Sequence, residues 1–160
     1  MEDQEIISKV KMILDFMSRS KFAYDEAAKT INFDLAMAAF SAEEREQLSE
    51  ILKSFSKSTD KNLLDRIPDN LEFYLDVYYR IILDLNNVAR YGNVYYNIIT
   101  RYYIDKEFTN IGAAVKALDG IGSRGTFFRR ANEACRQLYL IWSCTGPRYI
   151  SRVANEFKTL

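Results

Sequence analysis

Residues 108–153, FTNIGAAVKALDGIGSRGTFFRRANEACRQLYLIWSCTGPRYISRV, decide the fold of this chain. The run opens with small residues between 108 and 118, which predict a short helix that another helix can approach closely. Asp119-Gly120-Ile121-Gly122 then predicts a tight turn, because glycine adopts backbone angles that other residues avoid. Ser123 can accept a hydrogen bond from the first turn of a following helix, so it predicts an N-cap for a helix from Arg124 to about Leu140.

The segments on either side extend this pattern. Four residues before it recur at helical spacing and predict a helix over 94–104; they are Tyr95, Ile98, Ile99 and Tyr102. At the other end, the β-prone runs 140–145 and 148–153 flank Gly146-Pro147 and predict a β-hairpin. The predicted order is therefore helix, helix, turn, helix, hairpin.

The helix that begins at Arg124 has two possible apolar faces. One consists of Phe127, Ala131, Ala134 and Leu138, and the other of Phe128, Ala131, Cys135 and Leu138. Both choices fit helical spacing, and either one leaves one of the two phenylalanines exposed.

Charge is divided unevenly along the chain. Residues 1–85 contain 17 acidic and 11 basic residues, whereas residues 86–160 contain 5 acidic and 11 basic residues. Between residues 120 and 153, Glu133 is the only acid among six arginines, which are Arg124, Arg129, Arg130, Arg136, Arg148 and Arg152. Arginine binds phosphate through its charge and its forked donors, so this region predicts a polyanion partner. A solvated basic face is the alternative.

The order of elements in residues 93–153 resembles the winged helix-turn-helix, and in particular regulators similar to the multiple-antibiotic-resistance repressor (MarR) family. Recognition helices of that family often open with a Ser-Arg-small-Thr run, which Ser123-Arg124-Gly125-Thr126 matches, and Arg148 matches an arginine of the wing. The sequence departs from the family at Leu138, where a glycine usually precedes the wing, and at Arg130, where a buried aliphatic residue is common.

The resemblance implies how the chain would bind DNA. The major groove admits one α-helix, whose first side chains reach base edges. Arg124 and Arg129 are the first candidates for DNA contact, and Ser123, Thr126 and Arg130 are the next. Arg148 and Arg152 would lie on the wing, near a minor groove or the backbone.

The first half of the sequence predicts further helices. Apolar spacing predicts one over residues 4–19, and alanine content predicts another over 24–40, although alternating residues 31–37 leave a strand open. Ser41 and Glu44 form a capping box for the next helix. A narrow apolar seam then suits packing against another helix and suggests a homodimer; it consists of Leu71, Tyr74, Tyr78, Ile81 and Leu85.

These patterns predict a mainly α fold, with an N-terminal helical bundle followed by a winged helix-turn-helix that ends in a small C-terminal β-hairpin. The predicted domains are an acidic dimerisation or partner module over 1–70 and the winged helix-turn-helix with its preceding long helix over 71–160.

Composition excludes several classes of function. Histidine is absent and the two cysteines, Cys135 and Cys144, lack metal-ligand spacing, so no metal, cofactor or histidine-based catalysis is expected. A buried Cys135 is favoured over a redox sensor, and the tyrosines are favoured as packing residues over base-stacking platforms. The sequence contains no apolar run long enough to span a membrane, and its acidic start is unlike a signal peptide, so a cytoplasmic protein is expected.

The function expected from these observations is sequence-specific binding of double-stranded DNA by a homodimeric transcriptional regulator rather than by an enzyme. The alternative is a helical protein-interaction adaptor that uses the same fold without touching nucleic acid. A replication or partition protein of a plasmid or phage would bind DNA in the same way.

Overall fold

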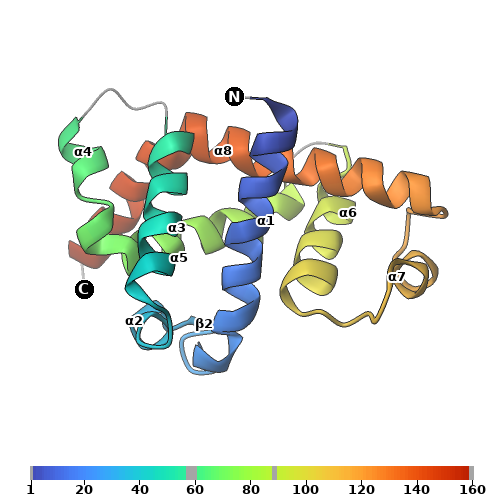
Figure 1. Ribbon diagram of the computed structural model, residues 1–160, viewed down its shortest axis with the longest axis horizontal. Helices are drawn as coiled ribbons and strands as arrows, with labels where there is room; N and C mark the ends of the chain where they lie inside the picture. The colour runs from blue at the N-terminus through green and yellow to red at the C-terminus, as the bar shows by residue number, and fades with distance from the viewer. Residues whose placement is uncertain (1, 57–60, 88–89, 159–160) are drawn as a thin grey trace. The chain divides into compact units, whose positions relative to one another are not determined.

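The computed structural model describes residues 2–56, 61–87 and 90–158, the last stretch from residue 145 onward as backbone alone. The protein is mainly helical, as predicted, and a small antiparallel sheet is present (Figure 1). In chain order the elements are α1 (Asp3–Arg19), η1 (Ser20–Ala23), β1 (Tyr24–Asp25), β2 (Thr30–Ile31), α2 (Phe33–Met37), α3 (Ala42–Phe55), α4 (Lys61–Asp65), η2 (Pro68–Asn70), α5 (Leu71–Asp84), η3 (Leu85–Asn87), α6 (Gly92–Asn97), the π-helix η4 (Ile98–Ile104), α7 (Ile111–Ala117) and α8 (Arg124–Lys158).

The chain folds into two compact units that interleave along the sequence. The first unit contains residues 1–19 and 81–139, and the second contains residues 20–80 and 140–160. Helices α5 and α8 contribute residues to both. The division therefore does not coincide with the predicted domain boundary between residues 70 and 71.

Three successive helical segments of the first unit surround one apolar cluster. Ile98 from η4, Ala114 from α7 and Phe127 from α8 are all fully buried in it. The ring of Phe127 meets the ring of Tyr102 edge-on, with 5.0 Å between centroids. On the N-terminal side α1 packs against η4. The predicted helix, short helix, turn and helix over 94–124 are all present, although residues 98–104 form a π-helix.

The turn between α7 and α8 is shaped by its glycines. Gly120 and Gly122 have φ angles of 82° and 73°, which L side chains rarely adopt. A Cβ on Gly120 would also lie 3.2 Å from Cγ2 of Val94, so the turn approaches α6 closely. Leu118 and Ile121 are buried and anchor the turn in the apolar cluster. The predicted tight turn is confirmed, and it fixes where α8 begins.

The second unit is built around contacts between α3, α5 and α8. The last carbonyls of a helix have no partner within the helix, and α8 supplies two of those partners to α3. The indole N–H of Trp142 donates to the carbonyl of Leu52 at 3.2 Å, and the hydroxyl of Ser143 donates to the carbonyl of Phe55 at 2.7 Å. The ring of Trp142 also lies 5.7 Å from that of Tyr78 on α5.

The predicted C-terminal β-hairpin is wrong. Helix α8 continues through residues 140–153, including Gly146-Pro147, to Lys158. Burial decides between the two conformations, because Leu138 and Trp142 are four residues apart and both are buried along one helical face. The chain therefore has no wing over residues 140–153, and Arg148 and Arg152 belong to a helix.

The prediction for residues 24–40 was partly wrong. Its first part is not helical, because β1 and β2 form a short hairpin in which Tyr24 faces Ile31. Asp25 stabilises the connecting turn by accepting hydrogen bonds from the backbone N–H groups of Ala27 and Ala28. Only Phe33–Met37 forms a helix, which Asn32 caps. The capping box of Ser41 and Glu44 at the start of α3 is confirmed.

The apolar seam of residues 71–85 is covered within the chain itself. Its residues Leu71, Tyr74, Tyr78, Ile81 and Leu85 are all at most 3% exposed. Two of them, Tyr74 and Tyr78, contact the ring of Trp142. The seam is thus part of the core and offers no free surface to a second copy.

Candidate nucleic-acid interface

The first turns of α8 have a buried face and an exposed face. Phe127, Ala131, Ala134 and Leu138 are buried, so the first of the two predicted core faces is confirmed, and Cys135 joins it. Phe128 is 46% exposed. Arg124 and Arg129 are exposed as well. Arg124 lies one turn before Phe128 on the same side of the helix, whereas Arg129 projects about 100° away from Phe128. Neither guanidinium makes a hydrogen bond or ion pair with any side chain that the structure describes.

Two of the predicted DNA-contact residues, Ser123 and Thr126, form the N-cap of α8. The Ser123 hydroxyl accepts a hydrogen bond from the backbone N–H of Thr126 at 3.2 Å and donates to the Thr126 hydroxyl at 3.0 Å. The confirmed cap begins the helix, and Ser123, Arg124 and Gly125 are exposed around it. Ser123 and Thr126 therefore shape the end of the helix that presents Arg124.

Arg130 contacts other side chains of the protein, which the sequence pattern did not predict. Its guanidinium donates to both carboxylate oxygens of Glu133, at 3.0 and 2.8 Å, and lies 3.6 Å from the ring centroid of Tyr91. The Tyr95 hydroxyl donates to the same carboxylate at 2.8 Å. The Arg130 side chain is only 13% exposed. Arg130 thus joins α8 to α6 and to Tyr91 and does not project with Arg124 and Arg129.

The hydrogen bonds of this cluster shift the pKa values of its members. Burial raises the pKa of Glu133, but the hydrogen bonds from Arg130 and Tyr95 outweigh burial, and the net pKa lies below 4.5. Burial and the hydrogen bond to Glu133 raise the pKa of Tyr95 to about 12. The carboxylate is therefore ionised and the phenol neutral at neutral pH, as the hydrogen bonds require.

Replacing Glu133 with glutamine should destabilise the protein by about 1.5–3 kcal/mol at neutral pH, because hydrogen bonds to a charged group contribute about this much. The lowered pKa of Glu133 means that the carboxylate stabilises the fold above pH 4.5 and that this contribution disappears as the pH falls below that value. Urea unfolding of both proteins at about pH 7 and pH 3 measures the difference, which should shrink in acid.

The matched control is Glu107→Gln. Glu107 pairs with Arg101, but its side chain is 43% exposed, so its loss should cost less than about 0.5 kcal/mol. An equal penalty for Glu133→Gln at both pH values would contradict the assigned role of its charge.

The remaining arginines differ in their surroundings. Arg136 points back to the N-terminal helix, with its Nη1 3.4 Å from Oδ2 of Asp3 in an exposed pair. The side chains of Arg148 and Arg152 lie outside the described residues. Arg124 and Arg129 are thus both exposed on the first two turns of α8, but they lie five residues apart and point about 140° away from each other around the helix. Arg130 is held against Tyr91 and Glu133, and Arg136 is paired with Asp3.

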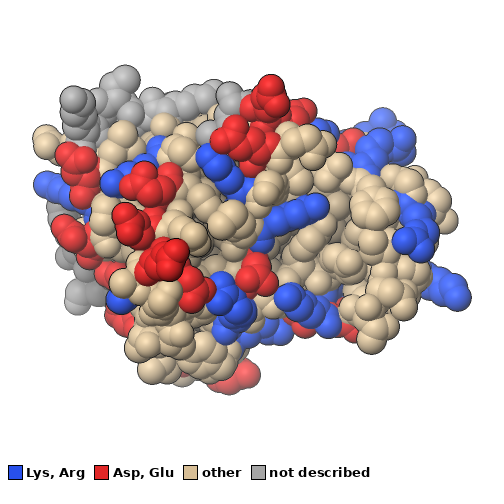
Figure 2. Space-filling model, in the orientation of Figure 1, with Lys and Arg blue, Asp and Glu red and all other residues tan. Residues whose placement is uncertain are grey.

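Figure 2 shows where charged side chains gather on one face of each unit. Lysines and arginines lie over α7 and the first turns of α8, while aspartates and glutamates lie over α3. The acids of α3 include Glu43 and Glu44 in its first turn, where their negative charge interacts favourably with the helix dipole. The basic surface accordingly coincides with the exposed side of α8.

Cys135 and two of the tyrosines, Tyr78 and Tyr95, are core residues. Cys135 is fully buried, and burial raises the pKa of its thiol to about 11, so it is not a reactive thiolate at neutral pH. Tyr78 and Tyr95 are buried as well. These observations favour the core role predicted for Cys135, Tyr78 and Tyr95, whereas Tyr79, Tyr96, Tyr102 and Tyr103 are only half-buried.

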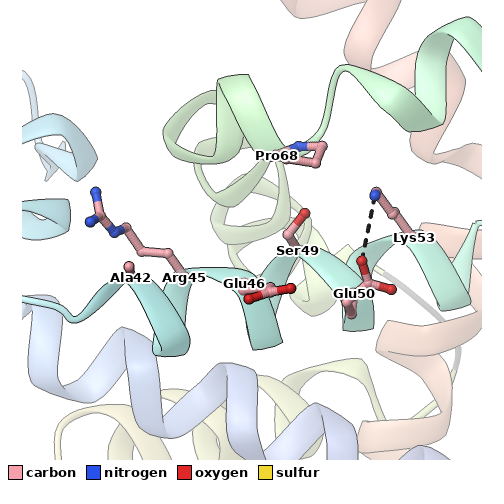
Figure 3. Close-up of a pocket in the computed structure, with 7 residues that line it drawn as sticks. All are labelled: Ala42, Arg45, Glu46, Ser49, Glu50, Lys53 and Pro68. Atoms are coloured by element: carbon pink, nitrogen blue, oxygen red, sulfur yellow. Dashed lines mark hydrogen bonds and ion pairs between the residues drawn. The ribbon is translucent and has the colours of Figure 1, made fainter.

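A hollow of about 430 Å³ lies in the second unit between α3 and η2 (Figure 3). Its charged lining residues are two cations, Arg45 and Lys53, and two anions, Glu46 and Glu50. The Lys53 ammonium donates a hydrogen bond to the Glu50 carboxylate at 3.5 Å. Because its charges are balanced and partly engaged with each other, the hollow favours neither an anionic nor a cationic ligand.

None of the helices within the described residues is long and apolar enough to span a bilayer. Comparisons with protein-family models, with curated proteins and with solved structures found no match for this chain. The resemblance to winged helix-turn-helix regulators therefore stays a prediction from the sequence, and its wing is wrong.

Proposed function

We propose that this protein binds double-stranded DNA with the segment formed by α7, the turn 118–123 and the first turns of α8. In this proposal α8 enters the major groove by its N-terminal end, as a recognition helix does, without the help of a wing. The proposed role is sequence-specific regulation of transcription.

The burial of Phe127 is the observation that carries the proposal. Because Phe127 packs the inner side of α8 against η4 and α7, other side chains of its first two turns face solvent, and Arg124 and Arg129 are among them. Both side chains are exposed, and neither guanidinium makes a hydrogen bond to a described side chain, although the charge of Arg129 also acts on the Glu133 carboxylate. A side chain of this type contacts guanine in the major groove or a backbone phosphate.

Other residues of the site support this surface from behind. Ser123 and Thr126 form the cap that holds the start of α8. Arg130 holds α8 to Tyr91 through stacking and to Glu133 through hydrogen bonds, so we assign it a positioning role. The proposed contact residues are thus Arg124 and Arg129.

Salt titration of DNA binding tests the proposal. A labelled pool of random-sequence duplexes, followed by fluorescence anisotropy, should show a logarithmic dependence of affinity on salt with a slope of about −2 or steeper, since each phosphate contact contributes about −0.9. Absent or salt-independent binding would favour the protein-interaction adaptor. The homodimer stays a prediction. Its interface cannot be the apolar seam of residues 71–85, because that seam is buried.

A further inference from the structure

Phe128 is an exposed aromatic residue on the first turns of α8, on the same side as Arg124. It is 46% exposed, and its ring meets the buried Phe127 ring at 5.9 Å. It lies one turn after Arg124 on the same side of α8, whereas the next residue, Arg129, projects about 100° away around the helix. An exposed apolar ring gains free energy when a partner removes it from water. A partner of this part of α8 should therefore combine negative charge with an apolar group that can reach the Phe128 ring.

We propose that Phe128 is a specificity-determining residue that recognises thymine by packing against its C5 methyl group in the major groove. This inference rests on the proposed binding of duplex DNA by α8. The thymine methyl is the apolar group that a base pair presents in that groove, and phenylalanine is one of the side chains that contact it. The Arg124 cation, one turn before the ring on the same side of the helix, suits a phosphate or a base edge close to that thymine.

Helix geometry is consistent with this assignment. Residues four apart lie on one face of a helix, and their Cα atoms are about 6 Å apart along the axis at a rise of about 1.5 Å per residue. Base pairs follow one another at about 3.4 Å, so Arg124 and Phe128 can reach bases about two steps apart. The thymine should thus occupy a fixed position relative to the base or phosphate that Arg124 contacts.

Replacing thymine with deoxyuridine tests the inference, because it removes the methyl group and keeps every hydrogen bond and charge. A duplex selected from a random pool by the full-length protein is remade with each thymine replaced in turn by deoxyuridine. Fluorescence anisotropy should show that one replacement weakens binding of the unmodified protein about fourfold, the value of one buried methyl group. This measurement needs no protein variant.

The variants Phe128→Ala and Phe22→Ala complete the test. Phe128→Ala should bind the thymine and deoxyuridine duplexes with equal affinity. Phe22 is 61% exposed in the second unit, so its variant should discriminate as the unmodified protein does. Equal discrimination by Phe128→Ala and the unmodified protein, or no effect of any replacement, would overturn the inference. Failure to select any duplex would instead refute the proposed function.

Discussion

Truncation of Phe127 to alanine is expected to lower the free energy of unfolding by about 3–5 kcal/mol, the usual cost of deleting a fully buried phenylalanine ring. Phe127 is 0% exposed and packs with Tyr102 in the cluster that joins η4, α7 and α8. The cavity left by the ring would be bordered by all three segments. Urea unfolding followed by circular dichroism measures the loss.

The adjacent residue gives the matched control. Phe128→Ala removes the same atoms from a ring that is 46% exposed, so it should cost less than about 1 kcal/mol. A reversed order of the two penalties would mean that α8 is rotated by one residue from the observed register. Both Arg124 and Arg129 would then change their direction, and the proposed interface would lose its basis.

Local signals of the sequence predicted the segment around this cluster well. The cap at Ser123 and the turn glycines act through the backbone of neighbouring residues, so their effect can be inferred without knowing the rest of the fold. The same holds for the capping box at Ser41 and for the helical spacing of α1. The choice between Phe127 and Phe128 was different, because both fit the period and only packing against Ile98 and Ala114 decides it.

The hairpin prediction failed because its signals were local and the deciding contacts are distant. Gly146-Pro147 between β-prone runs favours a turn, since proline removes a helical hydrogen bond. The structure instead shows Trp142 and Ser143 bonded to the carbonyls of Leu52 and Phe55, about 90 residues earlier in the chain. These bonds satisfy the end of α3 and hold α8 in helical form just before the proline.

Counting charges in the sequence likewise overestimated the number of arginines that are available to a ligand. Arginines appear equivalent in a sequence, but a guanidinium is free for a ligand only if the fold gives it no partner. Glu133 lies three residues after Arg130, a spacing that allows pairing on a helix, and this was the available signal. The stacking of Arg130 on Tyr91 had no such signal, because α6 and the segment before it are distant in sequence.

The double variant Arg124→Ala/Arg129→Ala is expected to reduce affinity for duplex DNA at least about tenfold at 0.1 M salt. If both guanidinium groups contact phosphates, the slope of log affinity against log salt should become less steep by about 2. If one of them contacts guanine, the loss should be larger for the selected duplex than for random DNA, because a bidentate contact contributes about 1–3 kcal/mol of discrimination. Fluorescence anisotropy over a salt series measures both quantities.

A variant with the same change in net charge separates local contact from general attraction. Lys29 and Arg66 are exposed in the second unit, and Lys29 has a φ angle of 54° that asparagine tolerates. Lys29→Asn/Arg66→Ala should therefore fold and should leave the salt slope nearly unchanged. If it weakens binding as much as the α8 variant does, DNA is attracted by overall charge and α8 is not the recognition helix. If only the α8 variant loses affinity, the exposed first turns of α8 are the binding surface.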